Sequence, residues 1–339
     1  MTTTEPWVAD SREALLADAT ARVVLDPGDG KSGATFERVT IDGRPHFAKT
    51  AGYRTDWLMR TSGDRDLRTL KIWRAGIMRD APTEIDHTVV GMAVDGTGEG
   101  AMLTMLMRDV GAHLIAEGDA KVSVETHLGL IDGLAALSAR YWGWTDDIGL
   151  KTLEERLRFF APETIAAEAT VPDPPVPIQV AMQGWPRLAE RAPELSALLT
   201  AIHTAPGALA EAMRSTPVTF LHGDWKMGNL GRHLDGRTIL LDWAYPGSGP
   251  VLWDLAWYLA LNRARLPISK EATIEAMRDA LDRRGVRTSG WFDLQLDLCL
   301  LGMAACMGWE KAMGDDDELR WWEQRAQIGA RHLSDAYQS

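Results

Sequence analysis

Short segments that are apolar or rich in β-branched residues predict β-strands in the first third of the chain. Residues 34–41 are rich in β-branched residues and lead into Asp42-Gly43, a dipeptide typical of two-residue hairpin turns. Residues 45–49 continue as the expected partner strand. Residues 102–107 form a continuous apolar run that stops at a charged pair. The amino-terminal part of the chain is therefore predicted to be rich in strands.

The remainder of the chain shows mainly helical periodicity. Apolar residues recur at helical spacing in the ranges 124–140 and 153–168, and the runs 253–261 and 294–307 are apolar enough to form core helices. The segment 171–177 contains four prolines, which fix φ and lack a backbone donor, so it is predicted to be a stiff break between helices.

Composition and charge restrict the class of protein. With 339 residues, 45% of them hydrophobic, the chain is long enough for a large core and two lobes or domains. A formal charge of −12 argues against a nucleic-acid surface and is compatible with a cationic ligand. Cys299 and Cys306 have neither metal-ligand spacing nor a disulfide framework, and no signal peptide or membrane span is expected. We therefore expect a cytoplasmic protein with no membrane partner.

The candidate chemistry lies between two predicted buried strands, 218–221 and 238–241. Asp224, Lys226 and Asn229 follow the first strand, and Asp242 follows the second. An Asp followed five residues later by an Asn, with a Lys between them, is the order of the catalytic loop in protein kinases. Phosphoryl transfer requires a base for the acceptor hydroxyl and oxygen ligands for Mg²⁺, and this cluster supplies both.

A glycine-rich segment precedes the first predicted hairpin. Gly28, Gly30 and Gly33 do not form a P-loop, because Leu25 stands where that motif requires another Gly. A dinucleotide-binding turn is also excluded, since a hairpin follows instead of a helix. A kinase-type flap over nucleotide phosphates fits better, because Lys49 stands on the next strand. A solvated turn is the alternative interpretation of the glycines alone.

The combination of motifs resembles the aminoglycoside phosphotransferase and choline kinase family. His222-Gly223-Asp224, the later Asp242-Trp243, and Gly249-Pro250 followed by Asp254 carry the resemblance, and the order of motifs extends it from about residue 23 to residue 254. The resemblance implies an α+β, bilobal protein-kinase-like fold. A small β-rich N-lobe is expected at 1–107 and a larger, mainly helical C-lobe at 108–339.

The resemblance also implies a role for each motif residue. Asp224 is expected to be the catalytic base, with Asn229 and Asp242 as the metal ligands for Mg²⁺. His222 is expected to support the loop, and Asp254 to be a structural carboxylate. Lys226 is predicted to act on the transferring phosphate. The nucleotide, ATP with GTP as an open alternative, is expected at Gly28, Gly30, Ser32, Gly33, Lys49, Asp66, Met105 and Met107.

A kinase-type Lys needs an acidic partner on a nearby helix. Residues 61–64 are typical of a helix N-cap and first turn, with an apolar face starting at Leu67. Asp66 best matches the position where the family places a Glu. Asp64 and Glu84 are the alternatives.

The acceptor is expected to be a small hydroxylated molecule, with a cationic one favoured by the acidic charge and an aminoglycoside or another antibiotic as the leading class. A metabolic kinase for a sugar, amino sugar or amino alcohol is the alternative, and a non-catalytic nucleotide-binding module is the hypothesis from another class. The short stretch from Asp242 to Asp254 leaves little room for the long activation segment of a protein kinase, which is therefore less expected. Oligomeric state is left open. Candidate acceptor-pocket residues are Asp146, Asp147, Glu310, the run 315–318, which is more typical of a solvated loop, and Trp142, Trp144, Trp225, Trp309, Trp321 and Trp322.

Overall fold

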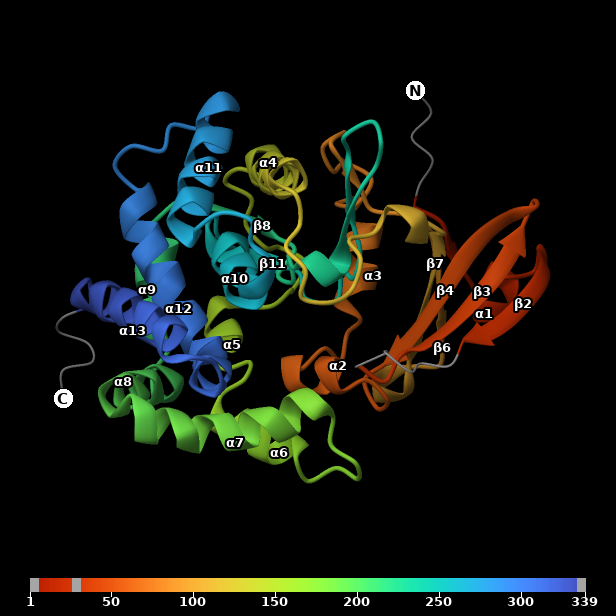
Figure 1. The fold of residues 1–339 in the computed structure, drawn as a ribbon. Helices are drawn as coiled ribbons and strands as arrows, with labels where there is room; N and C mark the ends of the chain where they lie inside the picture. Colours follow the sequence, from red (N-terminus) through yellow and green to blue (C-terminus); the bar gives the residue numbers. More distant parts are fainter. Residues whose placement is uncertain (1–5, 26–31, 334–339) are drawn as a thin grey trace.

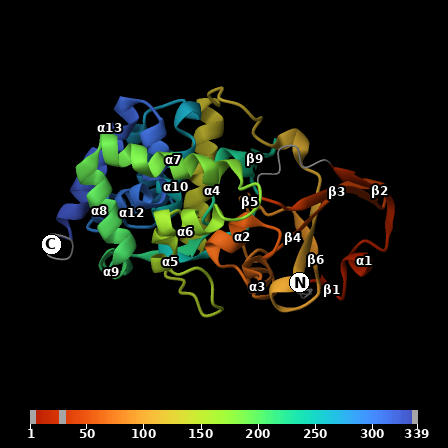
Figure 2. The ribbon, with the colours of Figure 1, turned by 90° about the horizontal axis from the view of Figure 1, so that it is seen from below.

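The computed structural model describes residues 6–25 and 32–333, which form two lobes (Figure 1). One lobe is built on a twisted sheet and the other almost entirely from helices. Both Figure 1 and Figure 2 place α2 (Trp57–Ser62) and α3 (Arg68–Arg74) between the sheet and the helical lobe. The predicted α+β, bilobal kinase-like fold is confirmed.

Among the described residues, the N-lobe contains a six-stranded sheet in the order β1-β6-β7-β4-β3-β2. β1 runs parallel to β6, and the other neighbours are antiparallel. Asp42 and Gly43 at the β3–β4 turn have φ of 50° and 70°, as a two-residue hairpin requires. The strands and the first helix are β1 Val8–Ala9, α1 Arg12–Leu15, β2 Ala19–Leu25, β3 Thr35–Ile41, β4 Arg44–Gly52, β6 Val89–Asp95 and β7 Met102–Arg108.

The predicted helix start at residues 61–64 is wrong. Thr61 and Ser62 form the last turn of α2, and Gly63, with φ of 65°, ends that helix. α3 starts at Arg68, whose backbone N–H donates to Asp64 Oδ1 at 3.0 Å. Asp64 therefore caps α3 from outside the helix, and the glycine separates two short helices where one was expected.

The C-lobe surrounds a long central helix, α12 (Phe292–Met313), against which α7, α10 and α13 pack. By length and composition α12 is the one described helix apolar enough to cross a membrane, but 83% of its apolar window is buried inside the protein, as in a core helix. The other helices are α4 Val124–Arg140, α5 Leu153–Leu157, α6 Pro162–Glu168, α7 Val176–Arg191, α8 Pro193–Thr204, α9 Gly207–Arg214, α10 Trp253–Leu261, α11 Lys270–Arg283 and α13 Asp316–Arg331, with 3₁₀ turns at Gly98–Gly100, Gly111–His113, Met227–Asn229 and Arg263–Arg265.

Two helices have the predicted bounds, and a third predicted helix is divided into two. α4 and α10 begin and end where the periodicity placed them. The range 153–168, predicted as one element, is divided into α5 and α6. Pro162 at the first position of α6 lacks the backbone donor that would continue the helix from α5.

Two small sheets in the C-lobe carry the motif loops. β8 (Val218–Leu221) pairs antiparallel with β11 (Gly247–Pro250). β10 (Thr238–Leu240) lies between β5 (Ile85–Asp86) and β9 (Leu230–Arg232). The loop 222–229 therefore connects the two sheets, and Asp242 follows the end of β10.

Buried His127 makes stability depend on pH. It bridges the Tyr258 hydroxyl and Thr273 Oγ1, and burial lowers its pKa from 6.5 to about 4. Below pH 6.5 the unfolded chain takes up a proton that the folded protein does not, so the folded state loses stability as pH falls toward 4. We expect His127 to account for about 2 kcal/mol of lost unfolding free energy between pH 7.5 and 5.

Urea titrations of the wild type and the His127→Gln variant at both pH values measure this contribution. The two unfolding free energies should converge by about 2 kcal/mol at the lower pH. If the difference between the two unfolding free energies is the same at both pH values, His127 takes up its proton in the folded protein as readily as in the unfolded chain.

Candidate active site

The loop that carries Asp224 is fixed by a carboxylate from α10. The backbone N–H groups of His222 and Gly223 donate to the two oxygens of Asp254 at 2.9 and 3.0 Å. Gly223 has φ of 84°, and a Cβ there would lie 1.9 Å from the Tyr245 carbonyl oxygen. A glycine at this position therefore allows the close approach that brings the next residue, Asp224, to the edge of the cavity.

Asp224 is buried, and both of its carboxylate oxygens are held. Oδ1 accepts from Trp257 Nε1 at 2.8 Å, and Oδ2 accepts from Asn229 Nδ2 at 2.7 Å. Lys226 Nζ lies 2.8 Å from the same Oδ2. These three donors fix the plane of the carboxylate, which is the geometry required of a group that takes a proton from a bound hydroxyl.

Asp242 forms an ion pair that connects the two lobes. Its Oδ1 accepts from Lys49 Nζ of β4 at 2.8 Å. Burial acts to raise the pKa of Asp242, but Lys49 and, more weakly, Lys226 act against it, and the pKa is lowered. Burial acts to lower the pKa of Lys49, and Asp242 raises it. Both groups therefore stay ionised inside the protein.

The predicted acidic partner of Lys49 is wrong. The Asp66 side chain is 77% exposed and lies near Lys71, at 3.6 Å. The alternatives fail as well, because Asp64 caps α3 and Glu84 pairs with Arg284 at 3.1 Å.

The acid of the N-lobe whose charge acts on Lys49 is Asp56, the N-cap of α2, whose side chain accepts from the Met59 N–H at 3.0 Å. Burial is the main cause that raises the pKa of Asp56, and Lys49 opposes it. The sequence Asp-Trp-Leu-Met is a helix N-cap signal that could have identified this carboxylate.

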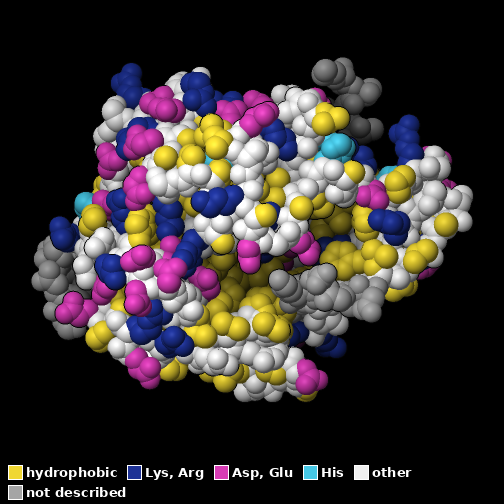
Figure 3. Space-filling model, in the orientation of Figure 1, with side chains coloured by type: hydrophobic (Ala, Val, Ile, Leu, Met, Phe, Trp, Pro, Cys, Tyr) yellow, Lys and Arg dark blue, Asp and Glu magenta, His cyan; other side chains and the backbone are white. Residues whose placement is uncertain are grey.

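A cavity of about 900 Å³ between the lobes is lined by Lys49, Asp224, Lys226, Asn229 and Asp242. The apolar part of its lining, which we call the apolar slot, is formed by Phe36, Val89, Met105, Met107 and Leu241. The slot adjoins the polar groups, because Lys49 lies opposite both Phe36 and Met105 in the sheet. Figure 3 shows hydrophobic side chains gathered in the hollow between the lobes. The cavity therefore joins a slot suited to a flat apolar ring with a cluster of charged and amide groups.

The predicted nucleotide-binding residues are only partly in this cavity. Ser32, Lys49, Met105 and Met107 line it, and Gly33 lines a neighbouring cavity instead. Gly28 and Gly30 lie outside the described residues. The structure therefore brings Ser32 of the glycine-rich segment, Lys49 of β4, and Met105 and Met107 of β7 to the site.

Asn229 and Asp242 suit a magnesium ion. The Nδ2 group of Asn229 is used by Asp224, which leaves its carbonyl oxygen as the ligand atom. Asp242 uses Oδ1 for Lys49 and retains Oδ2. The described residues contain no group of three or more His, Cys, Asp or Glu suited to a metal. A hard cation here would take its remaining ligands from phosphate and water, as is usual for Mg²⁺.

Most of the predicted acceptor residues lie elsewhere. Among the candidates, Glu310 and Trp309 line the cavity. The side chain of Trp225, a residue of the loop 222–229, is fully buried, so the prediction that it shapes the acceptor entrance is wrong. Asp146 accepts from the backbone N–H groups of residues 148–150, and Asp147 is exposed.

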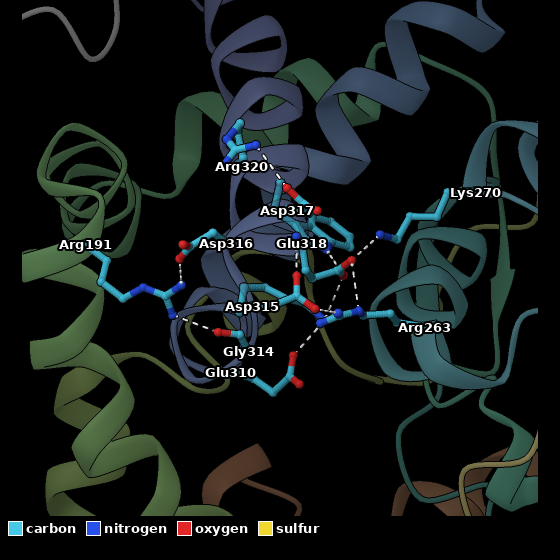
Figure 4. Close-up of polar contacts among 12 residues, drawn as sticks. Arg191, Arg263, Lys270, Glu310, Gly314, Asp315, Asp316, Asp317, Glu318 and Arg320 are labelled. Atoms are coloured by element: carbon cyan, nitrogen blue, oxygen red, sulfur yellow. Dashed lines mark hydrogen bonds and ion pairs between the residues drawn. The ribbon is translucent and has the colours of Figure 1, made fainter.

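The acidic run 315–318 begins a helix and is not a loop, while the side chains of Asp315, Asp316 and Asp317 are 55%, 80% and 93% exposed, as expected of a solvated run. Asp315 caps α13, and buried Glu318 is held by Lys270 and Arg263 (Figure 4). Asp316 pairs with Arg191. The run therefore fastens α13 to neighbouring helices and does not contribute to the cavity.

Trp257 is the functional candidate that sequence patterns missed. It lies in the apolar helix α10, where its type and spacing indicate only core packing. Its indole N–H contacts Asp224, and its ring lines the cavity and packs near Tyr245 and Phe159. Only the three-dimensional structure shows that this core side chain reaches the catalytic loop.

Comparisons with known proteins show similar folds and a family match. The chain is similar to solved structures of a microcompartment-associated aminopropanol kinase (15% identity, 96% and 97% of the two chains covered, TM-score 0.49) and a choline kinase from Streptococcus pneumoniae (12%, 95% and 96%, 0.45). It is also similar to an aminoglycoside phosphotransferase from Streptomyces rimosus in complex with ADP and streptomycin (18%, 89% and 95%, 0.46). Among curated proteins there is no match. The model of the phosphotransferase enzyme family matches residues 88–291, more than half of the sequence, so the chain belongs to this family of small-molecule kinases.

Proposed function

We propose that the protein transfers the γ-phosphoryl group of ATP to a hydroxyl of a small molecule that carries a single positive charge and an apolar surface. The observation that carries this proposal is the cluster of polar groups in the interlobe cavity. There the Lys49–Asp242 pair lies beside Asp224 with its three donors. These are the positioning and charge-neutralising groups that phosphoryl transfer needs.

In this mechanism Asp224 accepts the proton of the acceptor hydroxyl as its oxygen forms a bond to the γ-phosphorus. The bond from phosphorus to the β–γ bridging oxygen breaks, and ADP leaves with that electron pair. Lys49 and Lys226 offset the negative charge of the phosphoryl oxygens. A bound Mg²⁺, held by Asn229 and Asp242, would neutralise the phosphates and orient them.

The nucleotide base would occupy the apolar slot of the cavity. Met105 and Met107 of β7 and Leu241 offer flat apolar surface on either side of a purine, and burial of that surface favours binding. Nothing in this slot chooses between adenine and guanine by side-chain chemistry, so GTP is included in the assays below.

The lining of the acceptor region favours an amino alcohol over a polycationic aminoglycoside. Apart from the catalytic groups, the described lining residues include two carboxylates, Glu117 and Glu310, and one cation, Arg265. Glu310 is paired with Lys311 Nζ at 2.6 Å, so these four charges balance. Trp257, Trp309 and Phe160 add aromatic surface. Aromatic surface suits a single ammonium, whereas several ammonium groups would lack counter-charges.

An ADP-release assay with a panel of acceptors tests the proposal. The panel contains amino alcohols, amino sugars and aminoglycosides, each with ATP or GTP and Mg²⁺, and mass spectrometry identifies the phosphorylated product. We expect acceptor-dependent ADP release with at least one amino alcohol. Nucleotide binding without ADP release for any acceptor would favour the non-catalytic alternative.

Lys226 is predicted to act on the transferring phosphate. Its Nζ lies 2.8 Å from Asp224, and the charge of Asp224 is the main cause that raises the pKa of Lys226 against the effect of burial. Lys226→Met should lower kcat by about 10²-fold and leave the acceptor KM nearly unchanged, because charge stabilisation acts mostly in the transition state. Steady-state kinetics measure both constants. A raised acceptor KM with unchanged kcat would place Lys226 in the acceptor pocket instead.

Trp257 is predicted to position the base. Trp257→Phe keeps an aromatic ring but removes the donor to Asp224 Oδ1, so kcat should fall by about 10-fold, the cost of a hydrogen bond to a charged group, with the KM for ATP unchanged. Trp253→Phe is the matched control, since Trp253 is equally buried one turn earlier and its indole N–H has no hydrogen-bond partner among the described residues. Equal losses in both variants would mean that Trp257 serves only in packing.

A further inference from the structure

A second cavity, of about 980 Å³, lies between the start of α2 and the proline-rich segment that leads into α7. We call it the outer cavity. The two cavities adjoin, because five residues line both of them. We call this shared lining the passage, and it consists of Ser32, Trp57, Pro177, Trp309 and Glu310.

The outer cavity takes no part in the phosphoryl-transfer chemistry. Among the described residues that line it, none is Lys49, Asp224, Lys226, Asn229 or Asp242. Its volume is nevertheless as large as that of the interlobe cavity. A space of this size, open to the acceptor end of the site, is suited to a part of the acceptor that does not react.

One wall of the outer cavity is apolar and stiff. Val171, Val176 and Val180 alternate there with three prolines, at positions 172, 175 and 177. Proline has a fixed φ and little conformational freedom to lose on binding. Val176 is 69% exposed, so a ligand that covers it removes apolar surface from water. The wall is therefore preorganised for an apolar group.

The aromatic side chains of the shared lining give the ligand a direction. Trp57 and Trp309 supply aromatic surface for a cation there, whereas Glu310 is already paired with Lys311 Nζ at 2.6 Å. Farther out, Arg60 is bonded to Glu168, and the exposed side chains of Arg54 and Asp173 have opposite charges. A cationic nitrogen is thus favoured beside the two tryptophans, and the outer cavity offers no net negative charge to a second cation.

We propose that the outer cavity binds an alkyl or aryl substituent on the nitrogen of an amino alcohol acceptor. The hydroxyl of the acceptor lies at Asp224, its cationic nitrogen lies in the passage beside Trp57 and Trp309, and the substituent lies against the valine and proline wall. This inference rests on the proposed function, and it names the acceptor class as an N-substituted, amphipathic amino alcohol.

Calorimetric titration with a homologous series tests the inference. The probes are (2-hydroxyethyl)dimethylalkylammonium ions with methyl, butyl and hexyl chains, added to the protein with Mg²⁺ and a non-hydrolysable ATP analogue. Each buried methylene favours binding, so affinity should rise by at least about 10-fold from methyl to hexyl.

The Val176→Asp variant tests whether the alkyl chain of the probe lies against the valine and proline wall. Val176 is exposed at the first position of α7, where an acidic residue is compatible with the helix, so the variant should fold. Val124→Asp is the matched control, because Val124 is an exposed first residue of α4 outside both cavities. We expect Val176→Asp to weaken hexyl binding about 10-fold, to leave methyl binding within about twofold, and Val124→Asp to have neither effect.

The inference is overturned if no probe binds, if affinity does not depend on chain length, or if both variants behave alike. The same probes, incubated with ATP and followed by mass spectrometry for phosphorylation, test the proposed function separately. Binding that grows with chain length supports the outer site even where turnover is absent, and turnover without dependence on chain length supports the kinase function while excluding the outer site.

Discussion

Asp224→Asn is expected to lower kcat by about 10²–10⁴-fold while ATP still binds, because the change removes the base but retains the size of the side chain. The structure adds a second reason. Two of the three donors around the carboxylate, Asn229 Nδ2 and Lys226 Nζ, face the same oxygen. The Asn side chain has one acceptor oxygen where the carboxylate has two, so it cannot accept hydrogen bonds from Trp257 and from both of these donors. The loop therefore loses its fixed geometry as well.

The measurements for this variant are turnover with saturating acceptor and calorimetric titration with ATP. Asp147→Asn, an exposed change of the same type outside the cavity, is the control and should retain wild-type turnover. Retention by Asp224→Asn of more than about a tenth of wild-type kcat would remove Asp224 from the role of base.

Asp242→Asn is expected to lower kcat/KM for ATP by about 10²–10³-fold, equivalent to about 2.7–4.1 kcal/mol. The change removes the counter-charge of Lys49 and the anionic oxygen for Mg²⁺. Asn is the suitable replacement because the backbone at Asp242 has φ of 59°, a left-handed conformation that Asn tolerates better than Ala.

Lys49→Met separates the two roles of Asp242. It also breaks the ion pair, but it retains the carboxylate for the metal. ATP titrations with and without Mg²⁺ should show that binding by Lys49→Met still depends on Mg²⁺, whereas binding by Asp242→Asn does not. If both variants keep the metal dependence of the wild type, the assignment of Asp242 as a metal ligand is wrong.

Local sequence signals predicted the parts of the fold that local interactions decide. The Asp42-Gly43 hairpin follows from a backbone conformation that few residues adopt, and α4 and α10 follow from uninterrupted periodicity. The order of Asp224, Asn229 and Asp242 was also informative, because these groups lie near one another in the chain and the structure brings all three to one cavity.

Contacts between distant segments could not be predicted in this way. The partner of Lys49 comes from 193 positions later in the sequence, across the lobe boundary, and no helix pattern indicates it. Trp257 looks like a core residue until α10 is placed beneath the catalytic loop. The run 315–318 resembles a solvated loop, but Glu318 becomes buried because Lys270 and Arg263 supply counter-charges from another part of the chain.

The central claim is that Asp224 drives transfer of phosphate from a nucleotide to a hydroxyl of a small molecule. The most direct test incubates the wild type and Asp224→Asn in parallel with ATP, Mg²⁺ and an extract of metabolites, and compares the products by mass spectrometry. We predict a phosphorylated species that forms with the wild type and is nearly absent with the variant. Equal amounts of that species in both incubations, or ADP release with no phosphorylated molecule in either, would contradict the account.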